Sequence, residues 1–150
     1  MSSENKVRIL MCKTALSGLA GWLLAGHLGL VVACGACLVG HCWPVYHHFR
    51  GGKGVSVSAC IALLLDWRMF VVLLVLFAVI FLLSRRVSLC SVILAILYPA
   101  IYYLLGHGTD AGFWLCCGVT VIVVFCHRGN IRRILKGEEP PLTFGKGKER

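Results

Sequence analysis

Apolar stretches separated by short polar breaks dominate the chain of 150 residues. No charged residue occurs from Thr14 to Val39, and the only interruption is Gly26-His27-Leu28-Gly29. One membrane-spanning helix needs about 20 apolar residues, which makes this stretch too long for a single span. We therefore expect two antiparallel helices that meet at the Gly/His corner, the first ending near Ala25 and the second running from about Leu28 through Cys42.

Four further apolar segments follow in the second part of the chain. They are Val55 to Leu65, Met69 to Leu83, Val87 to Leu105 and Ala111 to Cys126. The first of these is short for a full span, whereas the others approach the required length. The pattern predicts an all-α, polytopic membrane protein with about six transmembrane or membrane-embedded helices.

The composition excludes a soluble globular domain. Hydrophobic residues make up 59% of the chain, charged residues make up 14%, and the mean hydropathy is +0.86. Soluble proteins are nearer half apolar and a quarter charged. The nine cysteines lie mostly in apolar segments, where cysteine packs as a small hydrophobic residue. Cys34-Gly-Ala-Cys37 has metal-binding spacing, but no second pair in a polar loop completes a zinc site, so we expect no metal and no cofactor.

The distribution of cations predicts the orientation in the membrane. Lys and Arg concentrate on the cytoplasmic side of membrane proteins. Alternate breaks, at Gly26-His27, Asp66 to Arg68 and Gly106 to Asp110, contain only Arg68 among the fifteen Lys and Arg. All other cations fall near the termini or in the remaining breaks, so we expect both termini and these breaks to face the cytoplasm.

One cytoplasmic break is unusually rich in polar groups and glycine. Its sequence is Gly40-His41-Cys42-Trp43-Pro44-Val45-Tyr46-His47-His48-Phe49-Arg50-Gly51-Gly52-Lys53-Gly54-Val55. Exposed backbone N–H groups and a lysine ammonium can converge on one phosphate. A nucleotide P-loop fits poorly, because Gly54 and not Ser or Thr follows Lys53 and no strand precedes it. The structural alternative is a glycine-rich turn with a snorkelling lysine, and we expect His41 and Pro44 to fix the helix end.

A second polar region, Cys126 to Glu139, follows the last apolar segment. On a helix leaving the membrane, His127 and Asn130 would lie on one face at three-residue spacing. Asn can donate a hydrogen bond to a phosphate or an oxyanion, and His can transfer a proton near neutral pH. For Arg132 and Lys136 the better interpretation is topogenic charge.

Both regions resemble signatures of one family. The run Gly40-His41-x-Trp43-Pro44-Val45-Tyr46-x-x-Phe49-Arg50-Gly51-Gly52-Lys53-Gly54-Val55 resembles the second signature of the bacterial acyl-phosphate:glycerol-3-phosphate acyltransferases. The run His127-Arg128-x-Asn130-Ile131-x-Arg133-Ile134-x-x-Gly137-x-Glu139 resembles the third. The two follow in the same order as in the family, and the resemblance extends from about Lys13 to the end of the third signature.

The resemblance implies a seven-helix enzyme of the bacterial inner membrane that acts in phospholipid synthesis. Such an enzyme transfers a fatty acyl group from acyl phosphate to the 1-hydroxyl of glycerol 3-phosphate, giving 1-acyl-glycerol 3-phosphate (lysophosphatidic acid) and phosphate. Its expected partners are these substrates, the bilayer and an acyl-phosphate-producing enzyme, with no nucleic acid. The acyl phosphate is already activated, so the chemistry needs orientation and anion stabilisation without a covalent intermediate.

The resemblance also assigns roles to individual residues. By this resemblance, glycerol phosphate is expected to bind at Gly51, Gly52, Lys53 and Gly54. The catalytic polar groups are expected to be His127 and Asn130. Glu139 is expected to brace the third signature. The resulting organisation is a non-matching polar lead at 1–12, an acyltransferase domain at 13–139 and a disordered basic tail at 140–150.

The sequence departs from the family pattern in two respects. Its first signature, a Ser-Gly-Asn and Thr-Asn loop with a following Arg after a first helix, has no counterpart here, and Val57 stands where Thr is usual. Two interpretations therefore stay open: an acyltransferase, or a truncated or degenerate non-catalytic membrane protein that keeps an anion-binding surface. A small transporter is disfavoured, because the charged residues lie at membrane edges and not at mid-depth.

Overall fold

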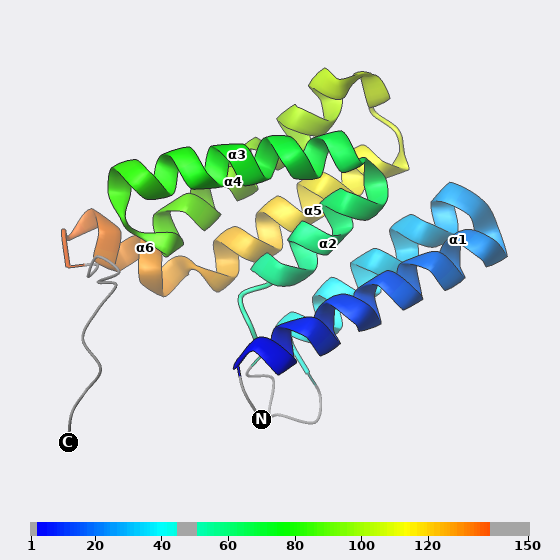
Figure 1. The fold of residues 1–150 in the computed structure, drawn as a ribbon, viewed down its shortest axis with the longest axis horizontal. Helices are drawn as coiled ribbons and strands as arrows, with labels where there is room; N and C mark the ends of the chain where they lie inside the picture. Colours follow the sequence, from blue (N-terminus) through cyan, green and yellow to red (C-terminus); the bar gives the residue numbers. More distant parts are fainter. Residues whose placement is uncertain (1–2, 45–50, 139–150) are drawn as a thin grey trace.

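The computed structural model describes residues 3–44 and 51–138, and all secondary structure in these ranges is helical (Figure 1). The elements in chain order are α1 (Ser3–Cys42), α2 (Val55–Leu65), α3 (Trp67–Ser84), α4 (Val87–Tyr102), the π-helical turn η2 (Tyr103–His107), α5 (Ala111–Cys126) and α6 (Arg128–Leu135). This architecture confirms the predicted all-α fold, and α2 and α5 have the predicted bounds.

Helix α1 is a hairpin of two antiparallel arms (Figure 1). Its helical geometry breaks at Ala25 (φ −144°, ψ 26°) and Gly26 (φ 59°, ψ −143°). The positive φ at Gly26 is a conformation that glycine adopts without steric cost. The arms touch at Gly21 and Gly29, where a Cβ on either residue would overlap the carbonyl oxygen of the other. The predicted helix pair and its Gly/His corner are therefore confirmed.

Several of these helices are long and apolar enough to cross a membrane. The candidate spans within the described residues are Val7–Cys42, Trp67–Ser84 and Val87–His107, and the pair α5 and α6, bent by 63°, adds a fourth if it counts as one span. Val55–Leu65 is apolar but has only 11 residues, as the sequence indicated. Counting the two arms of α1 separately, the structure contains the predicted set of apolar segments. The chain is a multi-pass membrane protein.

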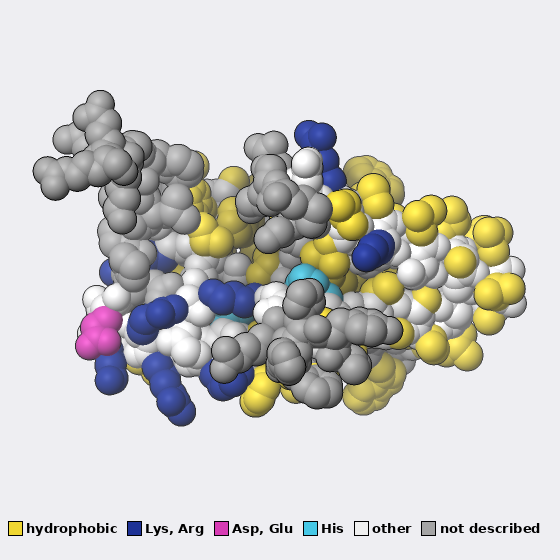
Figure 2. Space-filling model, turned by 90° about the horizontal axis from the view of Figure 1, so that it is seen from below, with side chains coloured by type: hydrophobic (Ala, Val, Ile, Leu, Met, Phe, Trp, Pro, Cys, Tyr) yellow, Lys and Arg dark blue, Asp and Glu magenta, His cyan; other side chains and the backbone are white. Residues whose placement is uncertain are grey.

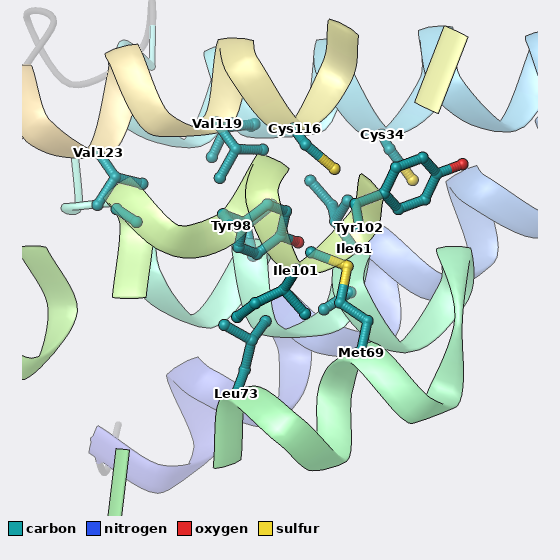
Figure 3. Close-up of a cluster of buried hydrophobic side chains, with 14 of the residues drawn as sticks. Cys34, Ile61, Met69, Leu73, Tyr98, Ile101, Tyr102, Cys116, Val119 and Val123 are labelled. Atoms are coloured by element: carbon teal, nitrogen blue, oxygen red, sulfur yellow. The ribbon is translucent and has the colours of Figure 1, made fainter. Parts of the chain in front are cut away.

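The core lies where α2, α3, α4 and α5 meet the second arm of α1. Figure 3 shows Ile61, Met69 and Tyr98 pointing toward one another from α2, α3 and α4, and all three are buried. The Tyr98 hydroxyl donates a hydrogen bond of 2.6 Å to the backbone carbonyl of Ser58, so this polar group is satisfied inside the bundle. Large apolar side chains such as Leu83 are exposed on the outside, where a bilayer and not water surrounds them.

Three polar breaks lie together at one end of the bundle, which we call the Asp–His end. His107 Nε2 lies 2.7 Å from Asp66 Oδ2, and the Arg68 guanidinium contacts the same carboxylate oxygen at 2.8 Å. His27 Nε2 lies 3.2 Å from Asp110 Oδ2. These are the breaks that the charge pattern assigned to one side of the membrane. Hydrogen bonds from Arg68 hold the pKa of the Asp66 carboxyl well below its usual range.

Candidate functional site

The two signature regions meet at the other end of the bundle, against Val123 of α5. A Cβ on Gly54 would lie 3.5 Å from Val123 Cγ2, which shows how closely the glycine loop approaches α5. The backbone carbonyl of Val123 in turn lies 2.8 Å from His127 Nδ1. Trp43 and Phe125 bring the end of α1 to the end of α5, with ring centroids 6.1 Å apart. Residues separated by more than half the chain therefore lie near one another at this end.

The glycine loop packs directly on the end of α1. The backbone N–H of Gly52 donates a hydrogen bond of 3.2 Å to the carbonyl of His41. A Cβ on Gly51 would overlap that carbonyl oxygen and would lie 2.6 Å from both the carbonyl oxygen of Cys42 and Cδ of Pro44. A Cβ on Gly52 would overlap the His41 imidazole. Close approach to the backbone of α1 therefore requires glycine at position 51, and contact with the His41 side chain leaves no room for a Cβ at position 52.

Gly54 turns the loop into α2. It has φ 80° and ψ −6°, and it precedes the first residue of α2 with no side-chain cap for the first turn. A Cβ at this position would lie 3.0 Å from Leu38 Cδ1 and 3.2 Å from Cys42 Sγ. The uncapped N–H groups give the start of the helix a partial positive charge. Lys53, which is exposed, carries a positive charge two residues before α2 begins, so both features favour an anion.

His127 is fully buried, with 1% of its surface exposed, at the bend between α5 and α6. The sequence predicted that it shares a helix with Asn130, but it precedes α6, with φ −93° and ψ 5°. Its Nδ1 must donate to the Val123 carbonyl, because a carbonyl oxygen only accepts. In the neutral imidazole the lone pair then lies on Nε2, which is the nitrogen able to accept a proton.

Asn130 is buried on the inner face of α6, with 6% of its surface exposed. Its Nδ2 donates a hydrogen bond of 2.7 Å to Ser88 Oγ at the start of α4. Reading the sequence missed Ser88. Its position just after Arg85 and Arg86, in a break assigned to the same membrane side as the third signature, was the available signal.

An apolar cavity of about 200 Å³ opens among α2, α3, α4 and α5 beside the two signature regions. Its lining residues are Val55, Ser58, Ala59, Phe70, Leu73, Leu74, Phe77, Ser91, Leu94, Ala95, Tyr98, Val119 and Val123. Val55 follows the glycine loop and Val123 holds His127, so one part of the cavity adjoins the polar site. Among the described residues, no Asp, Glu, Lys or Arg lines it, which suits part of an alkyl chain.

Cations surround the polar site. Figure 2 shows Lys and Arg side chains over the centre and left of this face, whereas hydrophobic side chains dominate toward the turn of α1. The exposed cations near this end are Arg8, Lys13, Lys53, Arg85, Arg128, Arg132, Arg133 and Lys136. Within the described ranges, no group of three His, Cys, Asp or Glu side chains is placed to hold a metal ion.

Some predicted features lie outside the described residues. These are Glu139, the tail at 140–150 and the part of the second signature at 45–50, which includes His47 and His48. Among the other predicted site residues, His41 and Pro44 contact the glycine loop, Gly54 lies against Val123, and His127 bonds to the carbonyl of Val123. Asn130 bonds to Ser88 of α4.

Comparison with known sequences identifies a matching family. The family described as "Glycerol-3-phosphate acyltransferase" matches residues 7–137. A glycerol-3-phosphate acyltransferase of Gloeobacter violaceus is 36% identical over 124 residues, covering 83% of this chain and 60% of the relative. The Brucella suis protein of the same description is 36% identical over 131 residues, covering 85% and 64%. The chain thus spans roughly three fifths of the length of these curated relatives.

The fold is also that of a solved membrane protein. The crystal structure of PlsY, an integral membrane glycerol 3-phosphate acyltransferase in its glycerol 3-phosphate form, superposes with a TM-score of 0.84 at 24% identity. The match covers 91% of this chain and 69% of PlsY. The lysophosphatidic acid form of PlsY gives the same TM-score and covers 70% of that chain. The likeness at this identity establishes the shared fold.

Proposed function

Since this chain belongs to the glycerol-3-phosphate acyltransferase family, we propose that it transfers a fatty acyl group from acyl phosphate to the 1-hydroxyl of glycerol 3-phosphate. The products are lysophosphatidic acid and inorganic phosphate. The single observation that carries the proposal is that Gly54 of the glycine loop lies against Val123, whose carbonyl accepts a hydrogen bond from His127. An anion-binding loop and a proton-accepting group thereby share one end of the bundle, beside an apolar cavity.

The phosphate of glycerol 3-phosphate is assigned to the glycine loop. Gly51 and Gly52 let the backbone lie against α1, Lys53 supplies a full positive charge, and α2 contributes its uncapped first turn. Hydrogen bonds between charged groups and backbone N–H donors are about twice as strong as neutral ones. The loop therefore binds glycerol 3-phosphate through its phosphate group, so that the 1-hydroxyl stays available for reaction.

The chemistry is a displacement at the acyl carbon. The 1-hydroxyl oxygen forms a bond to that carbon, and the bond from carbon to the phosphate oxygen breaks, with its electron pair leaving on phosphate. The hydroxyl proton passes either to His127 Nε2 or to a phosphate oxygen. Asn130, whose amide is oriented by Ser88, is the neutral donor assigned to the developing negative charge.

The alkyl chain of the donor is assigned to the cavity of about 200 Å³ among α2, α3, α4 and α5. Its lining is apolar apart from Ser58, Ser91 and Tyr98, and the Tyr98 hydroxyl already donates to the Ser58 carbonyl. An apolar chain entering from the bilayer meets no unpaired charge there. Its reactive end then lies near Val123, beside His127.

The cellular setting is part of the same proposal. Relatives from Gloeobacter and Brucella are bacterial, which supports the bacterial inner membrane as the location. The cation-rich end, with both termini, faces the cytoplasm by the positive-inside rule. Glycerol 3-phosphate then reaches the site from the cytoplasm, and an acyl-phosphate-producing enzyme is the partner that supplies the donor.

The test is acyl transfer by the purified chain in proteoliposomes, with radiolabelled glycerol 3-phosphate and a long-chain acyl phosphate. We expect labelled lysophosphatidic acid, and a loss of about 10²-fold or more in rate for His127→Ala. The pH dependence of the rate in wild type and in His127→Gln separates the two proton routes. If the imidazole accepts the proton, the wild-type rate changes with pH near neutrality and the rate of His127→Gln does not. If a phosphate oxygen accepts it, both proteins have the same pH profile. The proposal is contradicted if the wild-type chain forms no product under conditions in which a longer relative is active.

A further inference from the structure

The outer face of α6 carries a group of cations that the acyl-transfer chemistry does not use. Helix α6 leaves α5 at a bend of 63°, so it departs from the direction of the spanning helix at the membrane boundary. On its inner face, Asn130 is buried and bonded to Ser88. The outer face is exposed and points away from the bundle.

Helical spacing places four exposed residues on that outer face. Arg128, Arg132, Leu135 and Lys136 follow one another at intervals of four, three and one residues, and all are exposed. Leu135 has 82% of its surface exposed although it is apolar. Residues three, four, seven and eight apart share one side of a helix. We call these four residues the α6 outer face.

Among the residues that the structure describes, the cations of this face have no carboxylate partner. Within residues 3–44 and 51–138, the ion pairs involve only Asp66 and Asp110, which lie at the Asp–His end. Arg132 and Lys136 therefore have no carboxylate within these ranges that neutralises their charge. Arg128 is held at the end of α5. Its guanidinium lies 4.5 Å from the centroid of the Phe125 ring and donates a hydrogen bond of 3.1 Å to the Phe125 carbonyl.

We propose that the α6 outer face is a binding surface for anionic phospholipid headgroups. Three cations match the charge of lipid phosphates, and Leu135 supplies the apolar contact that an interfacial helix makes with the acyl boundary. The end of α5 fixes the face at headgroup depth. A free anion would leave Leu135 in water, whereas a bilayer surface covers it together with the cations.

Lipid binding on this face also acts on the site. Asn130 occupies the inner face of the same two-turn helix, so a headgroup held by Arg132 and Lys136 fixes the side of α6 that faces away from Ser88. The lipid surface is therefore a positioning contact for α6. The binding proposal itself does not depend on acyl transfer and is tested without it.

The test compares two double variants of the full chain, each lacking two cations. R132Q/K136Q removes charge from the α6 outer face, and R8Q/K13Q removes the same charge from exposed positions of α1 near the same end of the bundle. Detergent-purified proteins are titrated with phosphatidylglycerol and with phosphatidylcholine, and bound lipid is counted by native mass spectrometry. A third titration with inorganic phosphate separates a lipid site from an ion site.

We expect the wild-type chain to retain phosphatidylglycerol in preference to phosphatidylcholine. R132Q/K136Q should bind phosphatidylglycerol roughly 30-fold more weakly, from the attraction of two cations to an anionic surface. R8Q/K13Q should also bind phosphatidylglycerol more weakly, but the change in the logarithm of its dissociation constant should be less than half of that in R132Q/K136Q. Equal losses in both double variants, no preference of the wild type for the anionic lipid, or competition by millimolar phosphate each overturn the proposal.

Discussion

Replacing Gly51 by Ala tests whether the glycine loop depends on contact with the backbone of α1. An added Cβ would overlap the His41 carbonyl oxygen and lie 2.6 Å from the Cys42 carbonyl oxygen. Real Cβ atoms do not approach other heavy atoms closer than 3.0 Å, and these atoms belong to backbone that cannot rotate away. The loop must therefore move off the end of α1 by several tenths of an ångström or more.

The cost of that movement falls on ligand binding more than on folding. Forcing extra atoms into a packed site costs about 1–3 kcal/mol. Gly51 is exposed on its other side, so the loop can relieve the overlap by shifting outward. A displacement of about 1 Å in positioning groups can reduce activity about 10²-fold. We expect glycerol 3-phosphate to bind about 10- to 100-fold more weakly, with little change in melting temperature.

Isothermal titration of the purified protein with glycerol 3-phosphate measures the affinity, and a thermal melt in the same detergent measures stability. The matched control is Gly118→Ala in α5, where an added Cβ meets nothing within 4 Å. In the interior of a helix this change stabilises by up to about 1 kcal/mol and should leave affinity unchanged. Unchanged affinity in Gly51→Ala would refute the requirement for close approach at this loop.

Three further variants test other parts of the structure. Asp66→Asn should destabilise by about 1–3 kcal/mol at pH 7, because Arg68 and His107 lose a charged hydrogen-bond partner. The folded pKa of Asp66 is lowered, so its contribution is complete above the unfolded pKa, and the difference from wild type should narrow in melts below about pH 4, where the unfolded carboxyl is protonated first. Ala95→Leu, which fills part of the cavity, should slow transfer from long-chain donors more than from short-chain ones. Ser88→Ala should lower kcat about tenfold with little change in KM if it only orients Asn130, and an effect confined to KM would argue against that role.

The sequence was sufficient to predict the helices but not their contacts. Apolar length and polar breaks placed the corner of α1 at Gly26 and gave the bounds of α2, because these features depend on local composition and on membrane thickness. The pairing of Asp66 with His107 and of His27 with Asp110 was not predicted, although their common membrane side was. The charge pattern assigns each polar break to one side of the membrane, but the packing of the helices determines which side chains on that side contact one another.

The site shows the same division. Both signatures were identified as polar and anion-binding from residue types, and their joint location followed from topology. The bend at His127 was not predicted, since three-residue spacing to Asn130 suggested one continuous helix. Ser88 was also missed, because its role depends on a contact between α4 and α6 across 42 positions of sequence. Residues outside a motif become visible only when the fold brings them to it.

The measurement that tests the central claim most directly is binding of glycerol 3-phosphate to the purified chain in lipid nanodiscs. Wild type, Lys53→Ala and the charge-matched control Lys13→Ala are compared by titration at low and moderate salt. We predict saturable binding by wild type, a loss of about 10-fold or more in Lys53→Ala, and wild-type affinity in Lys13→Ala. Equal binding by wild type and Lys53→Ala, or equal losses in the two variants, would contradict a phosphate site built from the glycine loop.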